Sequence, residues 1–451
     1  MLVILCRFAP RCHNGHEMAG TKPAMTIQLR ETTMNAPIVL EPLADAERMP
    51  LDQIDVSDPK LYQNHVWQPY FARLRREEPV HWRENGMYGS FWSITKHQDI
   101  MDVETRHQEF SSETALGGIM VNDRPMEYRR PSFISTDPPK HTDQRRVVAP
   151  TFAPTNMQKM AIGIRKRVRC ILDGLPRNEV FDWVDLVAIE VTTQMLATLF
   201  DFPLEERRKL TFWSDVAVMD VNAGGIVDSE EKRLETLTEC LETMTGLWRE
   251  REKLPPRPDL ISMMAHGEGT HDLLDRPMEF LGNLILLIVG GNDTTRNSIS
   301  GGLWALHNYP DQWKKLRESP QLIPSFAQEA IRWQSPIIHM RRTALCDAEV
   351  GGKHVRKGDK VVMWYVSGNR DETAIPDADR FIIDRDKPRQ HLAFGYGIHR
   401  CVGARLAELQ LSILWEEILA RDLKIEVMGE PKRVYSNFIG GISTLPVRIA
   451  A

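Results

Sequence analysis

One short segment near the C-terminus constrains the fold of this chain more than any other: residues 394–403 read FGYGIHRCVG. Three glycines in ten residues allow the backbone to approach a flat partner closely. Cys401 opens a stretch whose apolar residues, at 402, 406, 409 and 413, have helical spacing. A thiol at the positive end of a helix, beside His399 and Arg400, is expected to favour the thiolate that ligates metals.

The other cysteines narrow the kind of metal site. The chain has six, at 6, 12, 170, 240, 346 and 401, and none forms a CxxC pair. Zinc ribbons need close pairs and secreted disulfide scaffolds need cysteine density, so a reducing, cytoplasmic location is expected. A lone thiolate suits an axial ligand to haem iron, since the porphyrin supplies four other ligands. The alternative is a buried structural cysteine in a glycine turn.

Charge and apolar runs exclude two classes of protein. The 57 basic and 62 acidic residues give a formal charge of −5, which argues against a nucleic-acid partner bound by counterion release. The apolar run at 1–6 is shorter than a signal peptide requires. The longest apolar stretch, 281–291, is far shorter than the roughly 20 residues of a transmembrane helix. We therefore expect no transmembrane segment.

The N-terminal part predicts a tail followed by a small hairpin. Residues 1–55 lack helical or strand periodicity, which predicts a poorly ordered extension in which Met25 and Met34 are alternative starts. A helix is expected near 70–78. Alternating residues at 80–82 and 90–94, around a turn at 84–86, predict two paired strands.

Helical periodicity dominates the middle of the chain. It covers residues 140–335, with breaks expected at 224–225, 255–256 and 267–269. The fold class is therefore mainly α with small β-sheets (α+β).

The spacing F-G-x-G-x-H-x-C-x-G at 394–403 resembles the haem-binding loop of the cytochrome P-450 family. The resemblance implies the P-450 fold, a triangular prism of helices around one haem b, with Cys401 as the axial ligand to the iron and Phe394 and Gly395 against the haem. Because the matching motifs span most of the chain, residues 56–451 are expected to form a single catalytic domain. Chain length alone favours about three domains.

A second motif matches the same family. Glu329 and Arg332 are three residues apart on a helical stretch and so share one face. In the resembled family such a pair, joined by an arginine ahead of the cysteine loop, stabilises the core behind the haem. Arg385 follows the matching segment here. The implied role is structural.

Four further residues match the groups that hold the haem propionates in this family: His141, Arg145, Arg342 and His399. His141 and Arg145 follow a Pro-Pro helix start and share one helix face. Each of the four can donate hydrogen bonds to a carboxylate. Taken singly, each would be a surface charge.

The segment 286–295 is an apolar helix that acquires two glycines, an acid and a hydroxyl. Each glycine costs about 1 kcal/mol in a helix interior, and room for dioxygen at Gly290 is a reason to accept that cost. Thr294 can divert a backbone hydrogen bond and open a groove. Asp293 and Thr294 resemble the acid–alcohol pair that delivers protons in this family. The alternative is a glycine kink with a capping Asp-Thr.

The positions of the motifs also indicate which residues surround the substrate, and none of these expected pocket residues carries a charge. A small apolar substrate is therefore expected. Segments 290–298, 397–403 and 407–410 resemble bacterial members that hydroxylate alkanes or fatty acids at the terminal methyl; steroid side-chain hydroxylation is the alternative. The expected pocket residues are Leu286, Val289, Ile338, Phe438 and Ile439.

The implied activity is that of a monooxygenase that inserts one atom of O₂ into a C–H bond. No flavin, nicotinamide or iron–sulfur segment is evident, so electrons are expected from a ferredoxin and its NAD(P)H-dependent reductase. The expected docking residues are Arg146, Arg400 and Arg405. Outside oxygenation, a haem-thiolate isomerase or dehydratase need not retain an acid–alcohol pair, and a haem sensor needs an output segment that is not evident.

Overall fold

The computed structural model describes residues 42–450, with side chains from Asp45 onward. Most of the predicted extension, including both alternative starts, lies outside the described residues. From Pro42 on, however, the chain is folded. Arg73 donates hydrogen bonds to the carbonyl oxygens of Ala46 and Met49, each at 2.5 Å. The folded region therefore begins before residue 56.

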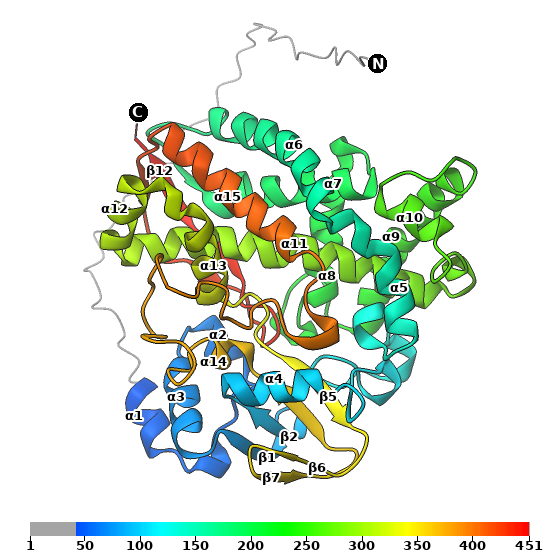
Figure 1. The fold of residues 1–451 in the computed structure, drawn as a ribbon, viewed down its shortest axis with the longest axis vertical. Coiled ribbons are helices and arrows are strands. Elements are labelled where there is room, and N and C mark those ends of the chain that lie inside the picture. Colours follow the sequence, from blue (N-terminus) through cyan, green and yellow to red (C-terminus); the bar gives the residue numbers. More distant parts are fainter. Residues whose placement is uncertain (1–41, 451) are drawn as a thin grey trace, which may run out of the picture. The chain divides into compact units, whose positions relative to one another are not determined.

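Helices make up most of the described chain (Figure 1). In chain order the α-helices are α1 Pro42–Arg48, α2 Pro59–Gln63, α3 Gln68–Glu77, α4 His97–Thr105, α5 Lys140–Val148, α6 Pro154–Asp173, α7 Glu190–Phe200, α8 Arg208–Val218, α9 Glu230–Arg251, α10 Leu260–His266, α11 Pro277–Asn308, α12 Pro310–Glu318, α13 Ile323–Gln334, α14 Tyr365–Gly368 and α15 Ala404–Ala420.

The strands are short and form small sheets. They are β1 Val80–Gly86, β2 Gly89–Ile94, β3 Phe110–Ser111, β4 Val180–Asp182, β5 Met340–Ala344, β6 Ala348–Val350, β7 Lys353–Val355, β8 Lys360–Met363, β9 Ile425–Val427, β10 Lys432–Arg433, β11 Ile442–Thr444 and β12 Pro446–Ile449. The largest sheet has the order β1-β2-β8-β5-β3, and only its β2–β8 pair is parallel. The smaller sheets are β4-β12-β9, β6-β7 and β10-β11.

The fold confirms the mainly helical class, and the three predicted breaks lie between helices. Gly224, for example, ends the turn before α9 with a φ of 70°. The hairpin prediction was right in its strands and wrong in its turn. Strand β1 continues to Gly86 through an irregularity at Asn85, whose φ is 51°, so the chain reverses at residues 87–88.

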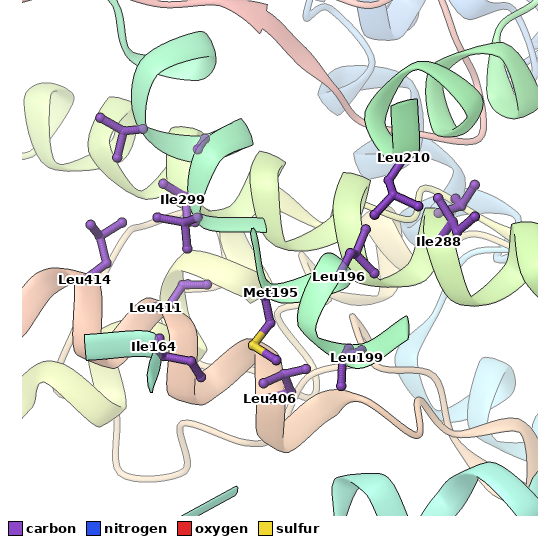
Figure 2. Packing of buried hydrophobic residues seen from close by; sticks show 14 of the residues in the cluster. Ile164, Met195, Leu196, Leu199, Leu210, Ile288, Ile299, Leu406, Leu411 and Leu414 are labelled. Carbon is purple, nitrogen blue, oxygen red and sulfur yellow. The ribbon is translucent and has the colours of Figure 1, made fainter. Parts of the chain in front are cut away.

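Helix α11 is the central element of the helical part. It begins with Pro277, a residue suited to the first helical position, and it packs against α7, α8, α13 and α15. Figure 2 shows apolar side chains of α6, α7, α11 and α15 meeting in one cluster. Because neighbours cover α11 on several sides, its residues are buried around most of its circumference, and it can present functional groups inside the protein. Within residues 42–450, no helix combines the length and apolar character of a membrane span.

Candidate active site

A large cavity lies between α11, the loop 114–135, strand β5 and the cysteine loop 394–403. Most of the side chains around it are apolar. It brings together most of the residues that the sequence singled out, and these are Leu286, Val289, Gly290, Thr294, Arg145, Arg342, Phe394, Gly395, His399, Cys401 and Phe438.

The cysteine loop is shaped by its glycines. Gly395 and Gly397 have φ values of 65° and 64°, a conformation that residues with a Cβ rarely adopt. A Cβ at Gly397 would also overlap the carbonyl oxygen of Glu104 on α4. The Cys401 N–H donates to the carbonyl oxygen of Phe394 at 2.8 Å, which closes the loop. The glycines therefore let the loop pack on α4 while Cys401 faces the cavity.

Cys401 lies three residues before α15. Its accessible surface opens into the cavity, and the thiol itself lies deep in the protein. Burial raises the pKa of the Cys401 thiol, and the backbone N–H groups of Gly403 and Ala404 and the nearby Arg145 only partly offset this rise. The local field, including that of Arg400, thus favours the thiolate as expected, but burial outweighs it in the protein alone. A coordinating metal ion deprotonates a thiol.

The four expected propionate-binding residues converge on one edge of the cavity. His141 does not line it but stacks on His399, with ring centroids 4.3 Å apart. Both ring nitrogens of His141 and Nδ1 of His399 are buried without a partner among the described residues. Arg145 donates to the carbonyl oxygen of Arg400. Burial, with Arg145 nearby, lowers the pKa of His141 to about 4.

Sequence reasoning missed two residues at this edge, Glu104 and Tyr365. Arg342 donates to Glu104 at 3.1 Å, and the Tyr365 hydroxyl donates to the same carboxylate. Burial raises the pKa of the Glu104 carboxyl in spite of these partners. The contacts join elements far apart in sequence, so no local pattern signals them.

The two glycines of α11 have different surroundings. A Cβ at Gly290 would meet nothing within 4 Å, whereas one at Gly291 would lie 2.6 Å from Leu196 of α7. Thr294 lines the cavity one turn after Gly290, and its hydroxyl donates to the Gly290 carbonyl oxygen at 2.7 Å. The helix is thus open to the cavity at Gly290 and tightly packed at Gly291.

Asp293 points away from the cavity. Its fully buried carboxylate accepts hydrogen bonds from Ser214 at 3.0 Å, Asn292 at 3.2 Å and Arg296 at 2.5 Å. Burial raises the pKa of the Asp293 carboxyl to about 6. The acid and alcohol are adjacent in sequence but face different surroundings, so a proton relay through both requires the Asp293 side chain to move.

Glu329 and Arg332 form a buried pair away from the cavity. Arg332 donates to both carboxylate oxygens of Glu329 at 2.7 Å, and Arg385 donates to Glu329 at 2.9 Å. Arg332 also donates to the carbonyl oxygens of Asn369 and Ala378. This network joins α13 to the segment that leads to the cysteine loop, the geometry expected of a structural pair.

Two of the expected pocket residues lie elsewhere. Ile338 and Ile439 line a second cavity, beside Trp304 and Trp333, while Ile337 and Met340 line the main one. Ile338 was expected in the pocket because it lies four residues before Arg342. Strand β5 begins only at Met340, however, so residue 338 lies outside the strand whose alternate residues Met340 and Arg342 line the cavity.

The main cavity also contains charges that the sequence did not predict. Arg124, Arg129 and Arg130, all in the loop between β3 and α5, line it. A loop carries no periodicity from which the direction of its side chains can be read, and this explains the omission.

Comparison with known proteins identifies this architecture. The family model of cytochrome P-450 matches residues 61–449. The chain belongs to the cytochrome P-450 family. Linalool 8-monooxygenase of Pseudomonas putida is 37% identical over 88% of this chain and 99% of its own length. Steroid C26-monooxygenase of Rhodococcus jostii is 31% identical over 87% and 84%. The structure of CYP153D17 from Sphingomonas sp. PAMC 26605 is 49% identical, with a TM-score of 0.83 over 89% of this chain and all of that one.

Cytochromes P-450 bind haem through a cysteine thiolate. The residues of this P-450 fit that group: Cys401 is the one cysteine of the described region that lines the cavity, and unpartnered donors lie at one edge. The chain is therefore a haem-thiolate monooxygenase, which uses O₂, a substrate and a source of electrons. Among the described residues no cluster of His, Cys, Asp and Glu suggests a further metal ion.

Proposed function

We propose that this P-450 hydroxylates the terminal methyl of a medium-chain alkane or fatty acid. The observation that carries the proposal is the mainly apolar cavity that extends along α11 to the opening at Gly290 and is also lined by Cys401. Leu286, Val289 and Phe438 line this path. A mainly apolar cavity that extends along a helix to the reactive centre favours an apolar chain.

The proposed roles of the protein residues follow from their positions. Cys401 would hold the iron, and His141, Arg145, Arg342 and His399 would hold the two propionates. The bound haem supplies O₂ activation. Thr294 would position a proton donor in the groove, and Asp293 would carry the proton from the far side of α11 after leaving Arg296.

A spectral binding screen followed by product analysis tests the substrate. The ligands are octane, dodecanoic acid and cholest-4-en-3-one, each added to the haem-loaded enzyme and then turned over with O₂ and a reducing system. We expect a spectral shift and a terminal alcohol from octane or dodecanoic acid. A shift and a product from the sterol alone would establish side-chain hydroxylation of a steroid instead. Cys401→Ala is the control and should lose the thiolate band of the reduced carbon monoxide complex.

We also propose that a ferredoxin donates the electrons and docks near the cysteine loop. Arg146, Arg400 and Arg405 are exposed there, and the side chain of Arg146 is 73% exposed. Reversing their charges should slow reduction by the ferredoxin and flatten its dependence on salt. Lys314 on α12 is an equally exposed control, at 77%. Equal effects of Lys314→Glu and Arg405→Glu would refute this docking face.

A further inference from the structure

Three arginines, Arg124, Arg129 and Arg130, line one wall of the otherwise mainly apolar cavity. The proposed hydroxylase role does not explain this positive charge. Of these three arginines, Arg129 is held by the backbone: its Nε donates to the carbonyl oxygen of Arg124 and its Nη1 to those of Thr114 and Ala115, at 2.7–3.1 Å. Arg124 lies 3.6 Å from the carboxylate of Glu230. These two side chains have structural partners.

Arg130 differs from both. Its guanidinium makes no hydrogen bond or ion pair with any residue of the described region, and its Nη1 is buried. Arg130 as a whole is half-buried, but a buried guanidinium N–H without an acceptor is costly. The Nη1 group of Arg130 is therefore available to an anion from outside the chain.

The charges around Arg130 leave an excess of positive charge. Arg124 and Arg233 both lie close enough to lower the pKa of Arg130, which burial and these neighbours bring to about 9. Glu230 is the one acid that acts on it, and this carboxylate already pairs with Arg233 and Arg124. One carboxylate thus faces three guanidinium groups.

The backbone of residue 130 lies beside α11, about two turns of the helix before Gly290. The carbonyl oxygen of Arg130 would lie 2.9 Å from a Cβ at Gly282, so residue 130 packs directly on α11. Gly282 and Gly290 are eight residues apart on this helix, a rise of about 12 Å. An extended medium-length alkyl chain can bridge such a span with one end at each glycine.

We propose that Arg130 binds the carboxylate of a fatty acid whose chain lies along α11 with its terminal methyl at Gly290. Within the proposed function, this selects the fatty acid over the alkane. Guanidinium–carboxylate pairs are strong and directional, because two N–H groups can donate to the two oxygens. The bound carboxylate would also fix the position of the alkyl chain along α11, so that the terminal methyl is the group that is oxidised.

The test compares three ligands of one chain length, dodecanoic acid, methyl dodecanoate and dodecane, by spectral titration of the haem-loaded enzyme. We expect the wild type to bind the acid at least about tenfold more tightly than its methyl ester, because the ester lacks the charged carboxylate that would accept hydrogen bonds from Arg130. Arg130→Met should reduce the preference for acid over dodecane by at least about tenfold, and Arg130→Lys should retain part of it.

Arg129→Gln is the matched control. It removes a neighbouring cavity arginine whose Nε and Nη1 are already bonded to backbone carbonyl oxygens, so it should leave the ratio of acid to dodecane affinities close to that of the wild type. An acid that binds the wild type no more tightly than its ester would overturn the inference even if a variant fails to fold. An equal loss of preference in Arg129→Gln and Arg130→Met would overturn it too. If either result overturns the inference but dodecane and the ester are still hydroxylated, the proposed function stands. If none of the three ligands binds or reacts, the proposed function fails as well.

Discussion

At the scale of single residues, Asp293 carries the clearest chemical signature. Its pKa of about 6 lies close to neutral pH, where a carboxyl group both takes up and releases a proton. Asp293→Asn keeps the shape of the side chain but cannot carry the proton. We expect product formation to slow by about 10²-fold or more, with substrate binding spectra unchanged. Single-turnover rates measure this, and an unaltered rate would remove Asp293 from the proton path.

The same residue predicts a dependence of stability on pH. Burial raises the carboxyl pKa from 3.8 to about 6 in the folded protein, so the folded state binds this proton more tightly than the unfolded chain. Ionisation therefore lowers the free energy of unfolding above about pH 6, and this loss is recovered as the pH falls toward 4. Relative to Asp293→Asn, the wild type should gain stability between pH 7 and pH 5. Denaturant titrations at both values measure the difference, and a constant difference would contradict the shifted pKa.

Thr294 gives a second residue-scale prediction. Its hydroxyl donates to the carbonyl oxygen of Gly290 and faces the cavity. Thr294→Ala should consume reductant at a rate near that of the wild type but release most of it as hydrogen peroxide, whereas Thr294→Ser should restore much of the product yield. Ser298→Ala is the control, since Ser298 also lines the cavity and donates to the carbonyl oxygen of Thr294 at 2.8 Å. Normal coupling in Thr294→Ala would contradict the proposed role.

At the scale of elements, substitution of the glycines of α11 is expected to change stability and activity in different directions. Alanine suits a helix interior better than glycine, and a Cβ at Gly290 meets no atom within 4 Å. Gly290→Ala should therefore raise the free energy of unfolding by about 0.5–1 kcal/mol while it lowers turnover, because the new methyl occupies the space next to Thr294. Denaturation and product assays on one preparation measure both effects. Gly291→Ala, which meets Leu196, should not be stabilising, and a fully active Gly290→Ala would show that this space is not needed.

The elements that could be predicted from the sequence are those whose pattern is contained in a short segment. The glycine pattern of the cysteine loop, the composition of α11 and the i, i+3 pair of α13 are readable within ten residues, and the structure has each of these elements. The turn of the β1–β2 hairpin was misplaced because Asn85 adopts a left-handed conformation within the strand. Ile338 was misplaced because β5 begins two residues later.

At the scale of the whole molecule, the features that the sequence did not reveal are contacts between distant segments. Glu104 meets Arg342 across 238 positions of the sequence, and the direction of the Asp293 side chain depends on Ser214 in another helix. Arg130 projects from a loop whose path is set by packing on Gly282. Such contacts depend on the assembled core, so they follow from the fold and from no single pattern.

The Glu329 network is a whole-molecule feature of this kind, because it joins α13 to the segment ahead of the cysteine loop. Glu329→Ala leaves Arg332 and Arg385 buried without their shared carboxylate, so we expect the free energy of unfolding to fall by about 3–5 kcal/mol and haem retention to fall with it. Glu235→Ala is the matched control: Glu235 also pairs at i, i+3 spacing, with Lys232 at 2.8 Å, but on an exposed face. Surface pairs contribute little, and this variant should unfold like the wild type. Denaturation followed by tryptophan fluorescence and by the haem absorbance tests both, and equal stability of the two variants would show that the buried network does not hold the cysteine loop in place.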